Sequence, residues 1–412
     1  MARTKFTKAE KSWILYDVGN SALVLLATSV IPIYFNSLAQ ADPAVEKVAV
    51  GAWGAAETIA SLVIALLMPV LGSIADMEGM RKKFIVGCVG TGAVATIAMG
   101  FPTHWLAFLI IYVISAIALN TSFVFYDALL VDATTDERMD EVSSQGFAWG
   151  YVGSCIPFVI CLLIVLNAQM LGLTMQNAML IAFVITSAWW VAFTIPMLKN
   201  VTQKQFKPRE SHAIRKAISG IGTTLRAIWA DESLRFFILA YFFYIDGVHT
   251  VIKMSTSYGS NLGIDGTQLV LALLVTQFVA WPSSIIYGRL GTTIGTKKML
   301  LVGIIGYFGI TLFAAFFLRT ATEFWILAIC VGLFQGGIQA LSRSEFGKLC
   351  PKEHANEYFG FFDIFGKYAA ILGTGLVSAF TFITGNPSLG VLSISVLFVI
   401  GFFIMLRVPD RR

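Results

Sequence analysis

The chain has 412 residues, of which 57% are hydrophobic and only 13% are charged. Soluble domains carry about 45–50% apolar and about 25% charged residues, so this composition excludes an ordinary water-soluble enzyme and, equally, a disordered chain. The net charge of +5, from 29 basic and 24 acidic residues, does not indicate a nucleic-acid partner.

Twelve mainly apolar stretches are long enough to cross a bilayer as helices, which takes roughly 20 residues each. They run near 13–38, 49–74, 84–101, 105–131, 144–167, 177–197, 234–258, 266–288, 299–318, 322–341, 357–384 and 386–407. The first stretch is too long for a signal peptide and no small-residue cleavage site follows it, so we expect it to be a membrane span. The sequence therefore predicts an all-α membrane protein.

The distribution of Lys and Arg predicts the orientation of these spans. The connections on one side carry only Lys47 and Arg319, whereas those on the other side, with both termini, carry the remaining basic clusters. By the positive-inside rule, both termini and the central connection are cytoplasmic, which requires an even number of spans. We expect a multi-pass protein of the cell (inner) membrane, with lipids as neighbours.

The central connection is the longest polar stretch and predicts the domain organisation. It separates an N-terminal half of six helices, residues 1–198, from a C-terminal half, residues 234–412. Within the linker, residues 199–233, apolar side chains recur at helical spacing at Ile214, Ile218, Ile221, Leu225 and Ile228. This pattern predicts an amphipathic helix on the inner leaflet that tethers the halves.

A short motif occurs in both halves at an offset of 216 residues (288 minus 72). In each copy two glycines lie seven residues apart and basic residues follow, while the acid of the first copy, Asp76, is replaced by Thr292 in the second. Glycine lets helix ends approach closely and turn sharply. An ordinary positive-inside loop explains the basic residues but not the paired glycines, so we interpret the motif as part of a gate, formed by Gly72, Asp76, Gly79, Arg81, Gly288, Gly295 and Lys297.

Six plus six spans with Gly-x-x-x-Asp-x-x-Gly after the second span resemble the major facilitator superfamily. Segments 13–22, 244–250, 336–344 and 357–363 are similar to its vacuole-effluxer branch, that of fungal vacuolar amino-acid effluxers and their bacterial homologues. The resemblance implies a transporter with the major facilitator fold. The chain departs from the family pattern at Met77 and Met80, where basic residues are usual, and at Val18 and Gly19, where an aromatic residue and alanine are frequent, a departure expected to change the pocket near span one.

The resemblance also implies that spans one, four, seven and ten line a central cavity. The candidate contacts from spans one, four and ten are then Tyr16, Asp17, Asn20, Tyr126, Gln335 and Gln339. Asp127 and Arg343 are again 216 residues apart and lie near the predicted inner face. We expect them to form a gate contact rather than to bind substrate.

Ionisable side chains inside spans cost roughly 2.5–3.5 kcal/mol each, so they are usually functional or paired. Asp246, His249 and Lys253 share one face of span seven and are suited to binding a zwitterion or relaying a proton. The structural alternative is an Asp246–His249 pair with Lys253 reaching the interface.

Three further charged positions lie within spans. Asp363 and Lys367 in span eleven are four residues apart, and mutual neutralisation is the alternative to a functional role. Glu57 has no partner in sequence and is a candidate carrier of coupling protons. The acids near the inner face, including Asp132, Asp136 and Asp140, are expected to form surface pairs with basic loops, worth under about 1 kcal/mol each.

No catalytic or nucleotide-binding motif occurs, and the five cysteines show no metal-binding spacing, so we expect neither an enzyme nor a cofactor. The prediction is a monomeric secondary active transporter that moves a small solute by alternating access, with proton-coupled export or exchange of amino acids. Translocation of lipids or amphiphilic drugs by the same fold is the first alternative. A non-transporting membrane receptor or scaffold is the second.

Overall fold

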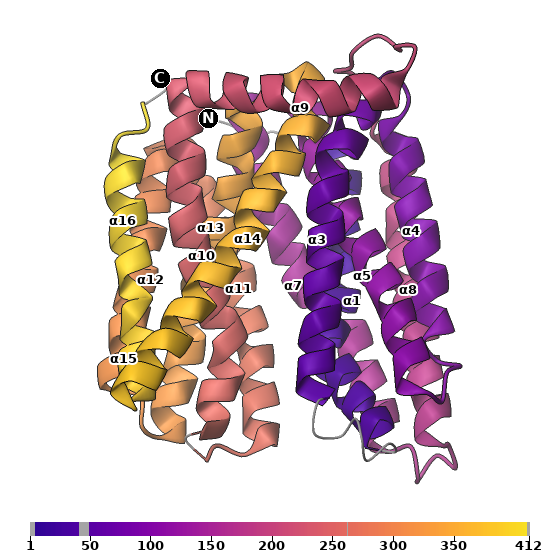
Figure 1. The fold of residues 1–412 in the computed structure, drawn as a ribbon, viewed down its shortest axis with the longest axis vertical. Coiled ribbons are helices and arrows are strands. Elements are labelled where there is room, and N and C mark those ends of the chain that lie inside the picture. The colour runs from indigo at the N-terminus through magenta and orange to yellow at the C-terminus, as the bar shows by residue number, and fades with distance from the viewer. Residues whose placement is uncertain (1–4, 41–48, 262, 410–412) are drawn as a thin grey trace. The chain divides into compact units, whose positions relative to one another are not determined.

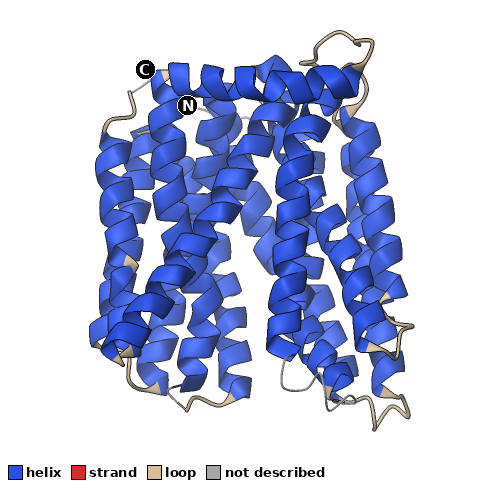
Figure 2. Ribbon diagram, in the orientation of Figure 1, coloured by secondary structure: helices blue, strands red, loops and turns tan. Residues whose placement is uncertain are grey.

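The computed structural model describes residues 5–40, 49–261 and 263–409. Within these ranges the regular structure is helical (Figure 2), and the one β-type contact is an isolated bridge between Met77 and Lys207. The predicted all-helical class is therefore confirmed. Lys47, whose charge entered the orientation prediction, lies outside the described residues.

Eleven helices in the described ranges are long and apolar enough to cross a membrane. Each coincides with one of the predicted spans. The predicted span near 84–101 corresponds to α4 (Arg81–Ala98), which is not among the eleven. Its 18 residues begin with Arg81, Lys82 and Lys83, which leaves a short apolar segment.

The chain divides into two compact units. Unit 1 comprises Met1–Ala133, Trp149–Ile218 and Glu353–Gly360. Its complete helices are α1 (Lys8–Ala39), α3 (Ala49–Ala75), α4 (Arg81–Ala98), α5 (Trp105–Ala128), α6 (Leu130–Ala133) and α8 (Met175–Asn200) (Figure 1). Unit 1 also holds the larger part of α7 (Met139–Leu166) and the first residues of α14 (Ala355–Thr384).

Unit 2 comprises Thr134–Ala148, Ser219–Lys352 and Phe361–Arg412. Its complete helices are α10 (Glu232–Asn261), α11 (Gly266–Ile294), α12 (Thr296–Phe316), α13 (Ala321–Leu349), α15 (Pro387–Ser393) and α16 (Ser395–Leu406). It also contains the start of α7, most of α14 and most of α9 (Ala213–Ala230). The beginnings of α7 and α14 are therefore each packed in a different unit from the rest of their helix.

Close packing of helices in unit 1 depends on small residues, as is usual in membrane bundles. A Cβ atom added to Gly19 in α1 would lie 2.9 Å from the Phe193 Cβ in α8, and one added to Gly92 in α4 would lie 2.6 Å from the Trp190 ring. The Val18 carbonyl accepts a hydrogen bond from Trp189 Nε1 at 3.0 Å. Gly19 thus meets α8 directly, and alanine at this position would clash with the Phe193 side chain.

The repeated glycines have the same two uses in both units. A Cβ on Gly72 would lie 2.6 Å from the Asn356 carbonyl oxygen of α14, and a Cβ on Gly288 would lie 2.5 Å from the Ser144 Cβ of α7. The second glycines, Gly79 and Gly295, have φ of 70° and 109°, which L side chains rarely adopt. The first glycine of each copy therefore admits a neighbouring helix, and the second permits the turn.

The linker helix occurs where its periodicity predicts it. α9 buries Ala217 and Ile228, whereas Ile214 and Ile218 remain 62% and 57% exposed. Because α9 leaves apolar side chains uncovered by protein, its placement on a leaflet remains our prediction.

The close approach at Gly72 gives a prediction for stability. Gly72→Ala should destabilise the fold by about 1–3 kcal/mol, because the new methyl group meets a backbone carbonyl that cannot rotate away. Thermal unfolding of the detergent-purified protein measures the effect. Gly87→Ala in α4 is the matched control, since no atom lies within 4 Å of its added Cβ. Equal melting temperatures for the two variants would contradict this account of the motif.

Candidate functional site

A buried polar cluster joins α1 and α5 in unit 1. The Asp17 carboxylate accepts hydrogen bonds from the Tyr126 hydroxyl at 2.8 Å and from Asn20 Nδ2 at 3.4 Å. These three side chains are at most 7% exposed. The structure therefore brings together three residues that the family resemblance selected from two spans, Asp17 and Asn20 from span one and Tyr126 from span four.

Aromatic rings enclose this cluster. Trp13 stacks on Tyr126 with ring centroids 4.4 Å apart, and its indole donates to the Tyr126 carbonyl at 3.0 Å. Tyr16 lies 4.5 Å from the same ring, and its hydroxyl donates to Ser122 Oγ at 2.8 Å. Tyr16 and Tyr126 are thus fixed at both ring and hydroxyl, so the Asp17 carboxylate has a defined position.

A related link occurs between α10 and α13 in unit 2. The Tyr244 hydroxyl and Ser342 Oγ are 2.7 Å apart, and both side chains are buried. This pair is similar to Tyr16 and Ser122, because each joins the first long helix of its unit to another long helix, although neither residue lies at the 216-residue offset. Both units therefore contain a buried Tyr–Ser hydrogen bond between two long helices.

Asp246 is the most deeply buried acid of α10, with no exposed surface. Its Oδ1 accepts from the backbone N–H of Gly373 in α14 at 3.0 Å and from the Thr250 hydroxyl at 3.3 Å. Its Oδ2 is buried and has no hydrogen-bond partner among the described residues. Farther along the same helix, His249 is half-buried and Lys253 is exposed, so the three predicted residues differ strongly in their environment.

The remaining predicted cavity residues are less tightly enclosed. Gln335 is buried in α13, whereas Gln339 and Asp363 are half-buried. Lys367 lies within α14, but its side chain is outside the described part of the structure. Glu57 in α3 is exposed and accepts a hydrogen bond from Tyr112 of α5.

Arg81 is the centre of a buried charge network at one end of unit 1. Its side chain has no exposed surface and forms ion pairs with Asp132 and with Asp76, the latter at 3.1 Å. Asp132 Oδ1 also accepts the backbone N–H groups of Lys204 and Gln205 at 2.8 and 2.9 Å. The expectation of a surface pair is therefore wrong for Asp132, because Arg81 of α4 and the start of the linker cover its carboxylate.

Asp76 fastens the first turn of α14 to this network. Its Oδ1 accepts the backbone N–H and Nδ2 of Asn356 at 2.9 and 2.8 Å, and its Oδ2 accepts the backbone N–H of Glu357 at 3.0 Å. Negative charge is favourable at a helix N-terminus. Burial raises the pKa of Asp76, while Arg81 and the donors from Asn356 and Glu357 oppose that rise.

The buried contacts of Asp76 with Arg81 and with the start of α14 are called here the corner of unit 1. This corner contains three groups with the chemistry of metal ligands. Asp76, His354 and Glu357 bring ligand atoms within 4.8 Å of one another. However, the Asp76 oxygens already accept N–H donors, and Lys207 Nζ lies 3.8 Å from Glu357 Oε2. Because Arg81 and Lys207 supply positive charge here, the arrangement does not require a metal ion.

Unit 2 contains the counterpart of this corner with the acid on the opposite partner. Asp140 at the start of α7 accepts from the Thr296 hydroxyl at 2.7 Å and pairs with Lys348 Nζ at 2.7 Å. Asp140 is 2% exposed, so the expectation of a surface pair is wrong here too, whereas Asp136 pairs with Lys352 at an exposed site as expected. In unit 1 the loop after α3 carries the acid, Asp76, and α14 carries Asn356; in unit 2 α7 carries the acid, Asp140, and its partner Thr296 is the first residue of α12.

Arg343 is part of the unit 2 corner. Its Nε and Nη2 donate to the hydroxyl and carbonyl of Ser143, each at 2.9 Å, and its guanidinium lies 4.3 Å from the centre of the Phe147 ring. Arg343 thus holds the start of α7. Asp127, its expected gate partner, is half-buried in unit 1, and their pairing stays a prediction.

The basic residues of the two loops cap the last long helices of their units. Lys82 Nζ donates to the Leu198 carbonyl at the end of α8, at 2.7 Å. Lys297 Nζ donates to the Leu406 and Val408 carbonyls at the end of α16, at 3.1 and 2.6 Å. Positive charge at a helix C-terminus is favourable, so these lysines also stabilise the bundle ends.

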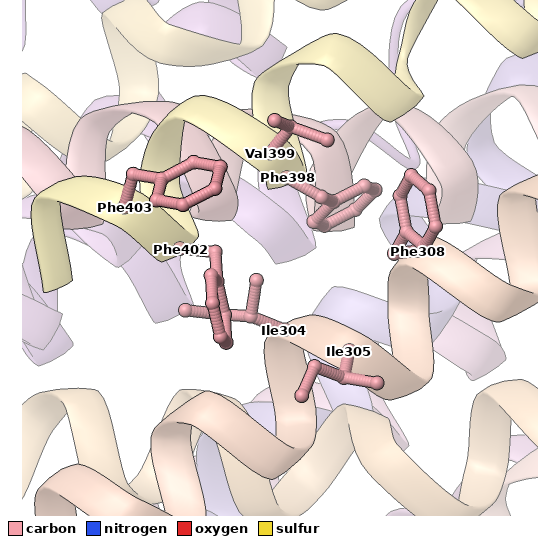
Figure 3. Close-up of a pocket in the computed structure, with 7 residues that line it drawn as sticks. All are labelled: Ile304, Ile305, Phe308, Phe398, Val399, Phe402 and Phe403. Carbon is pink, nitrogen blue, oxygen red and sulfur yellow. The ribbon is translucent and has the colours of Figure 1, made fainter. Parts of the chain in front are cut away.

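An apolar groove lies between α12 and α16 (Figure 3). Its lining contains only aliphatic and aromatic side chains: Ile304, Ile305, Phe308, Phe398, Val399, Phe402 and Phe403. A site for a polar or charged solute needs convergent polar groups, which this lining lacks. The groove is therefore suited to acyl chains and is not the candidate solute site.

The sequence analysis missed Asn356 and Ser143, which bind Asp76 and Arg343, and underestimated the burial of Asp132 and Asp140. One signal was available: Asp140 and Asn356 are separated by 216 residues, the same offset as Gly72 and Gly288. Their different residue types concealed the correspondence.

A known protein family and several known proteins are similar to this chain. A family model described as vacuole effluxer Atg22-like matches residues 55–412. YxiO of Bacillus subtilis, described as an uncharacterized MFS-type transporter, is 46% identical over 412 residues, covering 99% of this chain and 96% of YxiO.

More distant relatives share part of the chain or its fold. Autophagy-related protein 22 of Cryptococcus neoformans is 26% identical over 292 residues, covering 66% of this chain and 50% of the fungal protein, so the match spans about half of that relative's length. The crystal structure of the human organic anion transporter MFSD10 superposes with a TM-score of 0.75 at 13% identity, covering 97% of this chain and 99% of MFSD10. The structural likeness concerns the fold alone.

Proposed function

Since the chain belongs to the vacuole effluxer Atg22-like family, whose members are transporters of the major facilitator superfamily and not enzymes, we propose that it exports or exchanges amino acids. In this proposal it is a secondary active transporter, works by alternating access and is coupled to protons. The fungal relatives' family description as vacuole effluxers supports export. Fold-level likeness alone leaves the substrate open.

The proposal includes the full span count and orientation. α4 completes the twelve spans, with Lys82 and Lys83 near the cytoplasmic headgroups and Arg81 buried against Asp76 and Asp132, and the linker 199–233 joins the two halves in sequence. Both termini are cytoplasmic and the transporter acts as a monomer. The matching glycines and the Tyr–Ser links of the two units support six plus six helices.

The observation that carries proton coupling is the environment of Asp246. A carboxylate without exposed surface, with one oxygen lacking a partner among the described residues, is costly in a membrane span unless its charge changes during the cycle. We assign proton binding to this carboxylate. Asp17, held by Tyr126 and Asn20, is assigned to the substrate, together with Tyr16, Gln335 and Gln339.

The two corners are proposed to be the gate. Asp76 holds the start of α14 and Asp140 holds the start of α7, so both contacts join segments from different parts of the sequence. We infer that they form in one state of the cycle and separate in the other, as expected for bistable helix contacts.

Transport of neutral amino acids tests the substrate. Purified protein in proteoliposomes should take up radiolabelled leucine or its neutral relatives, faster with a pH gradient than without. Absence of flux for every neutral amino acid would eliminate this substrate class. Scrambling of a labelled lysolipid in the same vesicles would instead favour the lipid translocator.

Replacing Asp246 tests proton coupling. Asp246→Asn keeps an acceptor for Gly373 and Thr250 but cannot bind and release a proton, so gradient-driven flux should fall about tenfold or more while exchange persists. Glu353→Gln, which removes an exposed carboxylate, is the control and should transport normally. If the flux driven by the pH gradient is unchanged in Asp246→Asn, Asp246 has no role in proton coupling.

Replacing Asp140 tests the gate. Asp140→Asn breaks the ion pair with Lys348, and flux should fall about tenfold or more because one state loses a buried charge contact. Asp136→Asn removes the neighbouring exposed pair with Lys352 and should retain flux within about twofold. If Asp140→Asn does not fold, Ser344→Ala removes a single hydrogen bond to the same carboxylate. Wild-type flux in a folded variant of either kind would refute the gate.

A further inference from the structure

A second carboxylate of unit 1 lies in an aromatic environment unlike that of Asp17. Glu57 and Trp53 are four residues apart on α3 and therefore share one face of the helix. Tyr112 of α5 contacts both: its hydroxyl donates to Glu57, and its ring lies 4.4 Å from that of Trp53. A carboxylate and two aromatic rings thus meet at one point.

The rings behind this point are tightly packed, whereas the carboxylate is not. Tyr112 is 5% exposed, and Phe35 and Phe108, which extend the aromatic cluster from Trp53, have no exposed surface. By contrast, Glu57 is exposed and Trp53 is half-buried. The packed rings fix the position of Tyr112, and Tyr112 in turn orients an accessible carboxylate.

The charge of Glu57 lacks a counterion within the described residues, where no Lys, Arg or His forms an ion pair with it. A carboxylate within a membrane span is expensive without a cation or an aqueous path. Aromatic faces attract cations, ammonium groups in particular, and a neighbouring carboxylate adds direct charge attraction. The arrangement therefore matches an organic ammonium ion.

We propose that Glu57, Trp53 and Tyr112 form a recognition subsite for the ammonium group of the transported solute. The subsite is separate from the Asp17 cluster: Tyr112 and Tyr126 lie on one face of α5, 14 residues apart, which corresponds to about 21 Å along the helix. The Tyr112–Glu57 and Tyr126–Asp17 pairs then provide two successive binding positions for the solute along α5. This inference rests on the proposed transport function, but it concerns binding and is tested without transport.

Choline and its neutral isostere 3,3-dimethylbutan-1-ol are the probes. Choline should raise the melting temperature of the detergent-purified protein in a saturable manner, whereas the isostere should not, because only choline carries the charge. Glu57→Gln should weaken choline binding about tenfold or more, and Trp53→Leu and Tyr112→Phe should weaken it by smaller factors. Glu78→Gln, another exposed carboxylate just beyond the opposite end of α3, should bind choline normally.

Three results would overturn the subsite. They are equal shifts with choline and the isostere, unchanged choline affinity in Glu57→Gln, and choline binding that appears only after Lys47→Gln, which would identify Lys47 as the native counterion. If Glu57→Gln does not fold, the Trp53→Leu and Tyr112→Phe affinities decide. Leucine flux in proteoliposomes is measured separately, so failure of the subsite leaves the transport proposal intact, and loss of flux leaves the binding result standing.

Discussion

The constraint on which this structure depends is that a charge removed from water must meet an opposite charge or enough hydrogen-bond partners. Arg81, with no exposed surface, satisfies it by contacting Asp76 and Asp132. Removing one partner of such a buried pair typically costs about 3–5 kcal/mol, because the other charge remains buried. The start of α14, the end of α3 and the start of the linker are therefore held together by one guanidinium and two carboxylates.

The second unit satisfies the same constraint with different residues. Asp140 receives Lys348 and Thr296, and Arg343 holds the adjacent Ser143. In both units a glycine near the end of a helix, Gly72 in α3 and Gly288 in α11, admits the neighbouring helix, and in both a lysine caps the last long helix. The two units therefore share the same kinds of interaction, although different residues supply them.

Much of the fold could be predicted because bilayer thickness sets the length of each apolar run, and the observed helices coincide with those runs. The candidate site was predictable only where residue type carried the information, as for Asp246 or the Gly72 motif. The burial of Asp132 and Asp140 could not be predicted, because it depends on which distant helix ends cover them. The Gly373 N–H that binds Asp246 could not be predicted either, since every residue type except proline supplies a backbone donor.

The exchanged position of the acid in the two corners affects how such proteins are recognised. Each contact needs a single carboxylate, and either side of the contact can supply it: the loop does so with Asp76, and the incoming helix does so with Asp140. A sequence signature that requires aspartate in the loop therefore detects the Asp76 contact and overlooks the Asp140 contact, although both contacts are present in the structure. Pairing each loop with the helix that docks on it would recover the hidden copy in chains whose sequence symmetry has faded.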